Sequence, residues 1–401
     1  MRDKEQQMQC EGEAMNTVIE FFDEDPIENL ITCMNYQFDK VIYFGHKDSM
    51  TQERVRITRN SLKKICGIAE VSFVELSKKS LERVVEILER EVNAEKKQGN
   101  QCFFDLTGGE GLILVAMGIL STKYETPMHR YGIWSGELTV FGDKDGIRID
   151  RTVPEKKVKL TLDDMIAMWD GVINYRQQKM AKSHLNDEEF IRDFEKIWSV
   201  AGRDSKQWNT FSGVFKRFAG YENENLTVRA SVKELDKCIR QYGALTRRGA
   251  IAMLHELDEL GILENVKTNK EMLQYKFKNG IVKECLQDAG CALELHTYYE
   301  MKNSGRFSDC RVGVHIDWDG KIGGEEQDVI NEIDVLALEG YIPVFVSCKN
   351  GKVNQMALYE LDAVASRFGG KFVKKELRAG QELSEAYANR AMEMGITVVY
   401  D

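Results

Sequence analysis

The stretch NEIDVLALEGYIPVFVSCKNG, residues 331–351, decides the fold of the C-terminal part of the chain. Two runs rich in Val, Ile and Phe flank a central Gly-Tyr pair, which predicts a β-hairpin with Asp334 opposite Ser347. Side chains alternate between the two faces of a strand, so one face is predicted to be apolar and to pack on a core. The other face carries Glu332, Asp334, Ser347 and Lys349.

The polar face has two interpretations. Half-buried strands often expose one polar face, and a cross-strand pair of Asp334 and Lys349 would then be a surface ion pair of little energetic value. The same face becomes apolar beyond the cluster, at Leu336, Leu338 and Phe345, so we expect that end to be covered. A carboxylate and an ammonium beside a covered sheet favour a functional site.

Phosphodiester hydrolysis would use these groups. Carboxylates bind hard divalent ions, which polarise a phosphate and lower the pKa of the attacking water. A lysine beside the ion orients that water and offsets charge on the phosphate. With these residues the hairpin resembles the D-x(n)-(E/D)-x-K core of the PD-(D/E)xK restriction-endonuclease-like superfamily. The resemblance implies Asp334 as metal ligand, the Cys348 carbonyl as a second ligand and Lys349 as the catalytic lysine.

One position departs from this family pattern. Ser347 stands where the family usually has Glu or Asp, so a second metal-binding carboxylate has to come from elsewhere. Two candidates are Glu332 on the same face and Glu284 on the preceding helix. We expect Asp334, Lys349, Ser347 and Glu332 to form the catalytic group, with Mn²⁺ or Mg²⁺ as the cofactor.

The N-terminal part alternates short apolar runs with helical stretches, which predicts a parallel sheet covered on both faces. Ligands of such sheets bind at the carboxyl ends of the strands. The expected strands are 17–22, 40–45, 71–76 and 101–106, and the expected helices are 26–36, 51–66, 81–92 and 110–120.

A glycine turn lies in FFDLTGGEG, residues 103–111, between a strand and a helix. Glycines at this junction let backbone N–H groups approach an anion at the helix N-terminus, although such a turn is as often only a tight connection. The stretch lacks the spacing of an ATP- or NAD-binding loop. Loops after the first and second strands would face the same crevice. The expected ligand-binding residues are Asp23, Glu24, His46, Thr107, Gly108, Gly109 and Glu110.

The whole layout resembles the CRISPR-associated Rossmann-fold (CARF) effectors of type III systems, most closely at DLTGG and at NEID…SCKNG. The resemblance implies a homodimer that binds a cyclic oligoadenylate, above all cyclic tetra-adenylate, across its sensor domains. Binding would allosterically activate metal-dependent cutting of single-stranded RNA or DNA or of plasmid DNA in antiviral defence. The fold class is therefore expected to be α/β, with a Rossmann-like domain, a helical connector and a restriction-endonuclease-like α/β domain.

Composition bounds these expectations. The chain has 401 residues, a net charge of -10 and 43% hydrophobic residues, so two or three domains are expected. The negative charge argues against a protein that coats nucleic acid, but not against an enzyme with a local groove. Nine Cys without a CxxC pair, a polar N-terminus and the absence of a membrane-length apolar run predict a reduced cytoplasmic protein.

The expected division is a tail over 1–15, a sensor over 16–150, a connector over 151–270 and a nuclease over 271–401. The connector is either a helical spacer or a winged helix, since a helix near 249–261 precedes a hairpin-like stretch. Two other functions remain open. One is a ligand-responsive transcription regulator with a degenerate nuclease domain, which the acidic helix near 249–261 disfavours. The other is degradation of the cyclic nucleotide in the sensor, with His46 and Lys47 approaching the glycine turn.

Overall fold

The computed structural model describes residues 14–76, 80–143, 146–150, 158–175, 180–220, 225–318, 320 and 330–401. The described chain forms two compact units. The first ends at residue 160 and also includes 167–170; the second contains 161–166 and 171–401. Of the predicted tail, only residues 14 and 15 lie within the described residues.

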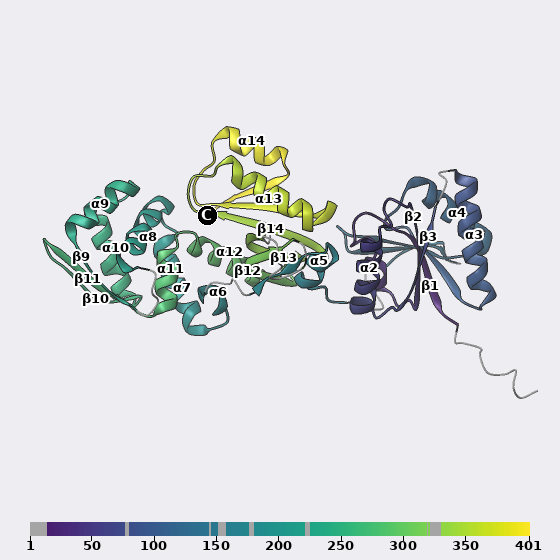
Figure 1. The fold of residues 1–401 in the computed structure, drawn as a ribbon, viewed down its shortest axis with the longest axis horizontal. Coiled ribbons are helices and arrows are strands. Elements are labelled where there is room, and N and C mark those ends of the chain that lie inside the picture. The colour runs from purple at the N-terminus through teal and green to yellow at the C-terminus, as the bar shows by residue number, and fades with distance from the viewer. Residues whose placement is uncertain are drawn as a thin grey trace, which may run out of the picture. The chain divides into compact units, whose positions relative to one another are not determined.

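The first unit is a sheet flanked by helices, with strands in the order β3-β2-β1-β4-β5-β6-β7 (Figure 1). Strands β3, β2, β1, β4 and β5 are parallel, and the β5–β6 and β6–β7 pairs are antiparallel. The strands are β1 Asn16–Phe21, β2 Lys40–Gly45, β3 Glu70–Glu75, β4 Gln101–Asp105, β5 Met128–Gly132, β6 Glu137–Asp143 and β7 Gly146–Asp150. The helices are α1 Ile31–Asn35, α2 Gln52–Ser61, a π-helical turn Leu62–Cys66, α3 Leu81–Lys97 and α4 Gly111–Tyr124.

This topology confirms the Rossmann-like prediction and places the switch in strand order between β1 and β4. The predicted helix over 26–36 is wrong in its first half. There the Asn29 side chain accepts a hydrogen bond from the Asp23 N–H and donates one to the Asp23 carbonyl, and the Asp25 carboxylate accepts from the Ile27 N–H. These side-chain bonds stabilise a sequence of turns, so α1 begins only at Ile31.

The second unit contains a six-stranded sheet, a three-stranded sheet and their helices. The elements before residue 280 are α5 Leu162–Met168, β8 Val172–Ile173, α6 Met180–Ser183, α7 Glu188–Ala201, α8 Ser205–Ala219, β9 Thr227–Ser231, α9 Val232–Tyr242, α10 Arg247–Glu259, β10 Leu263–Thr268 and β11 Met272–Phe277. Those after it are α11 Gly280–Gln287, α12 Cys291–Asn303, β12 Asp309–Asp317, β13 Ile330–Glu339, β14 Ile342–Lys349, α13 Gln355–Phe368, a 3₁₀ turn Gly370–Phe372, β15 Lys374–Ala379, α14 Glu385–Glu393 and β16 Ile396–Tyr400.

The middle of the chain is more than a helical spacer. Elements α8, β9, α9, α10, β10 and β11 follow one another, and the three strands form an antiparallel sheet in the order β10-β11-β9. This is the winged-helix order that the sequence suggested. Strand β9 was not predicted from the sequence, and its partner β11 lies about forty residues further along the chain. A five-residue strand with a distant partner leaves little local signal.

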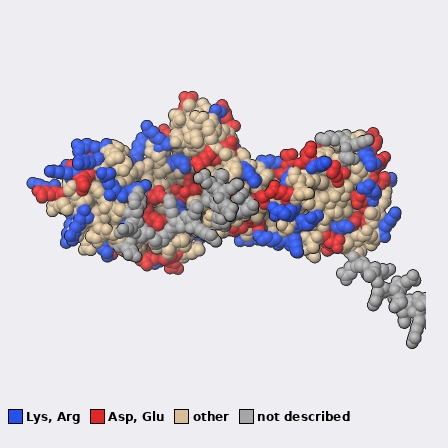
Figure 2. Space-filling model, viewed as in Figure 1, with Lys and Arg blue, Asp and Glu red and all other residues tan. Residues whose placement is uncertain are grey.

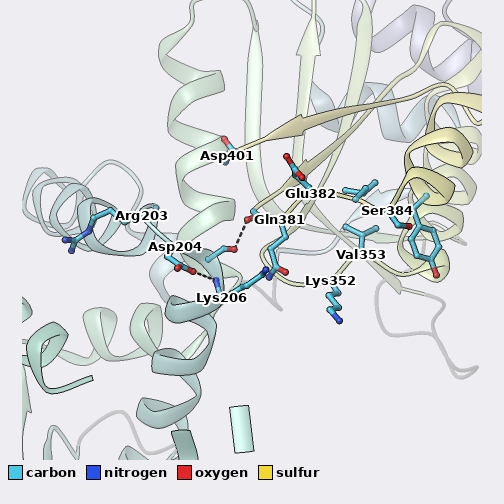
Figure 3. Close-up of a pocket in the computed structure, with 14 residues that line it drawn as sticks. Arg203, Asp204, Lys206, Lys352, Val353, Gln381, Glu382, Ser384 and Asp401 are labelled. Atoms are coloured by element: carbon cyan, nitrogen blue, oxygen red, sulfur yellow. Dashed lines mark hydrogen bonds between the residues drawn. The ribbon is translucent and has the colours of Figure 1, made fainter. Parts of the chain in front are cut away.

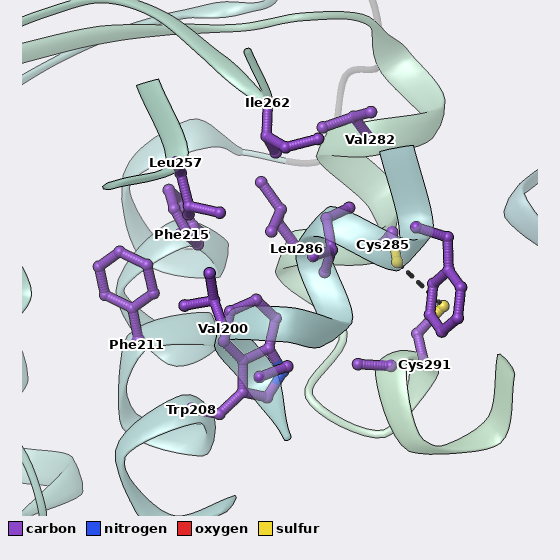
Figure 4. Packing of buried hydrophobic residues seen from close by; sticks show 14 of the residues in the cluster. Val200, Trp208, Phe211, Phe215, Leu257, Ile262, Val282, Cys285, Leu286 and Cys291 are labelled. Carbon is purple, nitrogen blue, oxygen red and sulfur yellow. Dashed lines mark hydrogen bonds between the residues drawn. The ribbon is translucent and has the colours of Figure 1, made fainter. Parts of the chain in front are cut away.

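The six-stranded sheet has the order β16-β15-β14-β13-β12-β8. The predicted hairpin is present, with Glu339 opposite Ile342 and Val335 opposite Val346. Its apolar face, including Val335, Val346 and Cys348, is buried in a core shared with the helices of the winged-helix segment. Figure 4 shows the centre of that core, where Trp208, Phe211 and Phe215 of α8 pack near Leu286 of α11. The opposite face is covered as expected, since Leu336, Leu338 and Phe345 are fully buried.

No helix among the described residues is both long and apolar enough to span a lipid bilayer.

Candidate functional site

The polar end of the hairpin is organised around the carboxylate of Asp334, which is 14% exposed. Its Oδ2 atom accepts hydrogen bonds from the Cys348 N–H at 2.6 Å and from the Ser347 hydroxyl at 3.3 Å. The Lys349 ammonium lies 3.5 Å from the same oxygen. The structure therefore brings Asp334, Ser347 and Lys349 together, with the carboxylate held in place by the opposite strand.

A second carboxylate near Asp334 comes from Glu294 of α12, which is buried. Three residues further along the same helix, the Thr297 hydroxyl lies 3.6 Å from the Cys348 sulfur, so this side of α12 packs on the hairpin. Burial first, and then the charge of Asp334, raise the pKa of Glu294 to about 7, although Lys182 acts in the opposite direction. A buried carboxyl group whose ionisation is opposed by a neighbouring carboxylate is suited to binding a cation.

The buried side chain of Lys182 is the cation that lies against these groups. Its Nζ atom lies 2.6 Å from Glu294 Oε2 and 3.0 Å from Glu332 Oε1. Burial alone would lower the pKa of Lys182, but the charges of Glu294 and Glu332 outweigh burial and leave the pKa raised. Gly313 of β12, whose φ is +60°, permits this approach, because a Cβ atom there would lie 2.4 Å from the lysine chain.

Glu332 lies on β13 beside the same lysine, and its other oxygen is 3.9 Å from His315 Nε2 of β12. Together with Asp334, Ser347 and Lys349 it lines a cavity of about 150 Å³. Helix α13 closes that cavity with Ala357, Leu361 and the carboxylate residue Glu360. All four residues that were expected to form the catalytic group thus border one cavity.

Glu284, the other candidate carboxylate, lies on α11 and is partly exposed; its role as a metal ligand stays a prediction. The glutamate on which the charge of Asp334 acts is Glu294, which sequence reasoning missed. Helix α12 is buried on nearly all sides, so it has no amphipathic period to reveal it. The available signal was a single Glu inside the otherwise apolar run CALEL, since an unpaired buried carboxylate is costly.

In the first unit, the residues after β1 and β4 meet at the switch in strand order. The Gly109 N–H donates a hydrogen bond to Asp23 Oδ2 at 3.2 Å. A Cβ atom on Gly108 would lie 3.0 Å from the same oxygen, and Gly109 has a φ of +118°, which favours glycine. The two glycines therefore permit the close approach of the acidic loop to the turn.

The other expected residues lie at the same edge. His46 Nε2 is 3.1 Å from Glu110 Oε1, which links the loop after β2 to the residue that precedes α4. The Thr107 hydroxyl donates to Asp105 Oδ1 at 2.7 Å and accepts from the Tyr131 N–H at 2.9 Å, so it stabilises the turn itself. Glu24 is exposed on the acidic loop.

A pair of acids lies buried beneath this turn. Burial, followed by interaction with Asp105, raises the pKa of Glu20 well above its usual value. Burial also raises the pKa of Asp105, although hydrogen bonds from Glu20 and Thr107 act in the opposite direction. Burial thus disfavours the charged form of both carboxyls, and the interaction between them adds to this effect at Glu20.

Comparison with known proteins identifies the fold. The sequence matches no known family and no curated protein. The protein VC1899 from Vibrio cholerae has a similar structure, with a TM-score of 0.71 and 16% identity over 96% of this chain and 94% of that one. Can2 from Sulfobacillus thermosulfidooxidans, solved in complex with cyclic tetra-adenylate, has a TM-score of 0.65 and 14% identity over 96% and 93% of the two chains. These likenesses extend over both units and confirm the α/β fold class.

Proposed function

We propose that this chain is a metal-dependent nuclease of type III CRISPR defence that a cyclic oligoadenylate activates. One observation carries the proposal: Asp334, Lys349 and Glu332 line one cavity at the polar end of a hairpin whose other face is core. The charge of Asp334 also acts on the buried Glu294 of α12. Such a cluster of charged groups is unfavourable in a merely structural sheet, because taking carboxylates out of water raises the free energy of the folded state. A phosphodiester-cutting site gives each group a role.

The donor set fits a hard divalent cation, because Asp334 and Glu294 supply carboxylate oxygens and Cys348 supplies a carbonyl. Such an ion, when bound, polarises the phosphate and lowers the pKa of a water molecule. The protein's own residues then position the reactants. The Cys348 N–H and the Ser347 hydroxyl fix the Asp334 carboxylate, and the Lys349 ammonium orients the attacking water and offsets charge on the phosphate.

The crevice between β1 and β4 is the proposed site of cyclic tetra-adenylate. Can2, whose structure is similar to that of this chain, was solved in complex with cyclic tetra-adenylate. The acidic Asp23 and Glu24 suit base amino groups or ribose hydroxyls rather than phosphates. Since the Gly109 N–H is bonded to Asp23, a phosphate gains this donor only when the Asp23 side chain turns away. The crevice thus couples ligand entry to a movement of the loop after β1.

A symmetric ring would bind across two copies of the chain, which accords with a homodimer. Helix α4, which follows the glycine turn, leaves Leu112, Val115 and Ile119 between 41% and 51% exposed. These side chains recur at the spacing of one helix face, opposite the buried Ile113, Met117 and Leu120. An apolar face of this kind beside the ligand crevice is suited to pairing with its own copy.

The test is to incubate the purified protein with single-stranded RNA, single-stranded DNA or supercoiled plasmid, with Mn²⁺ or Mg²⁺, across a panel of cyclic oligoadenylates. We expect cutting only when metal and activator are both present, and strongest activation by cyclic tetra-adenylate. Cutting of no substrate under any of these conditions would overturn the proposal.

The winged-helix segment supports a second candidate, a ligand-responsive transcription regulator. Figure 2 shows Lys and Arg side chains gathered over the end of the second unit that carries α9, α10 and the β9–β11 sheet. Lys233, Arg240 and Lys270 are exposed there. A regulator would bind one duplex sequence at least about a thousandfold more tightly than others, whereas a nuclease would not require such selectivity. Competition between specific and random duplexes separates the two.

A further inference from the structure

The second unit contains a larger cavity of about 850 Å³ next to the hairpin site (Figure 3). Three segments line it: residues 202–206 around the start of α8, Lys352–Val353 after the hairpin, and residues 380–387 after β15. Asp401 completes the lining. Its volume falls within the range of ligand-binding pockets, about 300–1,000 Å³, and it opens widely to solvent.

The wall of this cavity is continuous with the strand end that carries Lys349. The Gly380 N–H donates to the Lys349 carbonyl at 3.1 Å, and the Ser205 hydroxyl donates to the Gly380 carbonyl at 2.6 Å. A Cβ atom on Gly380 would lie 2.5 Å from the Asn350 side chain, so glycine is needed for this close approach. Lys352 follows Lys349 by three residues, at most about 10 Å along an extended chain.

Most acidic groups of the cavity are already engaged. The Asp204 carboxylate caps α8 by accepting from the Lys206 and Gln207 N–H groups, each at 3.0 Å. Asp401 lies 3.3 Å from the Arg378 guanidinium. Glu382 has no ion pair with any described residue.

Two basic side chains of the cavity have fewer partners than most of its acidic side chains. Lys206 and Lys352 are exposed, and neither forms a salt bridge with a residue that the structure describes, although the charge of Lys206 acts on Asp204. In the view of Figure 3 they lie on either side of Gln381. Two unpaired ammonium groups with the Tyr387 ring, the Ser384 hydroxyl and the Gln381 amide offer the contacts that a nucleotide chain uses: charge for phosphates, an aromatic face for a base and polar groups for sugar and base edges.

We propose that this cavity binds the nucleic-acid strand beside the scissile phosphate, with Lys206 and Lys352 on its phosphates. The inference rests on the proposed nuclease function and extends it to a substrate class. A base can stack on the Tyr387 ring only when its own face is not covered by a neighbouring base of a duplex, so these contacts favour an unpaired strand. The strand is therefore single, or locally opened, where it passes from the cavity to Lys349.

The experiment measures binding of a fluorescein-labelled single-stranded oligonucleotide, as RNA and as DNA, by anisotropy across a range of salt concentrations. All proteins carry Asp334→Asn to prevent cutting, and the activator is saturating. The test variant adds Lys206→Ala and Lys352→Ala. The matched control adds Lys196→Ala and Lys216→Ala, which remove two exposed lysines from α7 and α8 outside the cavity. The two variants have the same net charge.

We expect Kd to rise about tenfold in the test variant, equivalent to about 1.4 kcal/mol, and to change little in the control. The slope of log Kd against log salt should fall by about 1.4, because each lost phosphate contact contributes about 0.7 on a single strand. Equal Kd values in test and control would overturn the cavity proposal. Displacement of the oligonucleotide by AMP at a comparable concentration would also overturn it, since the cavity would then be a mononucleotide site.

A parallel cleavage assay separates this inference from the proposed function. With Asp334 intact, the Lys206→Ala/Lys352→Ala variant should show a raised KM and nearly unchanged kcat. If the wild type cuts normally and the variant has an unchanged KM, only the cavity proposal is contradicted. A wild-type protein that neither binds nor cuts nucleic acid contradicts both.

Discussion

The ammonium of Lys182 lies 2.6 Å from a carboxylate oxygen of Glu294, and both side chains are buried beside the hairpin that carries Asp334. Burial and the charge of Asp334 both raise the pKa of Glu294, and Lys182 acts against them. The lysine therefore offsets the carboxylate charge and stabilises the folded site. A divalent ion bound to both carboxylates would compete with Lys182 for Glu294.

Substitution of Lys182 tests this competition. Lys182→Met leaves Glu294 without its cation, and removal of one partner of a buried pair costs about 3–5 kcal/mol. We expect a lower Tm for the variant, together with a larger rise of Tm on addition of Mn²⁺ than in the wild type. Differential scanning calorimetry with and without Mn²⁺ measures both. Equal metal-induced shifts in the two proteins would show that Lys182 and the ion do not share a carboxylate.

The two candidate glutamates give opposite expectations. Glu294→Gln removes a proposed ligand and should raise the Mn²⁺ concentration needed for half-maximal cutting by tenfold or more, about 1.4 kcal/mol per tenfold. Glu284→Gln removes the ligand that the sequence predicted; if Glu294 takes its place, this variant should leave that concentration nearly unchanged. Titration of cleavage rate with Mn²⁺ checks both variants. If only Glu284→Gln raised the Mn²⁺ concentration for half-maximal cutting, the metal ligand would be Glu284 of α11 rather than Glu294.

Gly108→Val tests the sensing crevice. A Cβ atom at this position already lies 3.0 Å from Asp23 Oδ2, so valine has to displace the acidic loop and fill the crevice. Activator binding should weaken by several kcal/mol, about 1.5–3 for each charge-assisted hydrogen bond lost. Cleavage at saturating activator should approach the wild-type rate, as calorimetric titration and activator dose curves will show. Normal affinity with no cleavage would assign the turn to catalysis.

The buried acids Glu20 and Asp105 predict a pH dependence of stability. Their pKa values are raised in the folded state, so the folded unit retains a proton that the unfolded chain releases. The contribution to stability is complete below the unfolded value, near 4.3 for Glu, and is lost as pH rises through the folded pKa. Glu20→Gln should flatten this fall and raise Tm at neutral pH, by about 2–4 °C for each kcal/mol gained. Parallel Tm-versus-pH curves for the two proteins would contradict this assignment.

The sequence predicted those parts of the molecule whose pattern is local. The alternation in residues 331–349 indicated the hairpin and its polar face, and the continuous apolar runs indicated the parallel strands β1 to β4. The β15 strand was not predicted, because KKELRA is mostly polar and lacks the apolar pattern of a buried strand; its parallel partners are β14 and β16. Pairing with distant strands decides its conformation.

The candidate site was predictable where its residues share one strand pair, and not where they come from elsewhere. Asp334, Ser347 and Lys349 lie on the hairpin itself. Lys182 and Glu294 come from α6 and α12, far from the hairpin in sequence, and only packing brings them to it. A cation buried by tertiary contacts leaves no periodic signal in the chain.

The most direct measurement of the central claim is activator-dependent cleavage by the wild type, Asp334→Ala, Lys349→Ala and Ser347→Ala, each with its affinity for cyclic tetra-adenylate measured in parallel. We expect Asp334→Ala and Lys349→Ala to lose cutting by about a hundredfold or more, as for loss of a group that stabilises the transition state. Ser347→Ala should lose much less, and all three variants should bind the activator as the wild type does. Near-wild-type cutting by Asp334→Ala or Lys349→Ala, with Mn²⁺ and activator present, would contradict the assignment of the hairpin as the nuclease site.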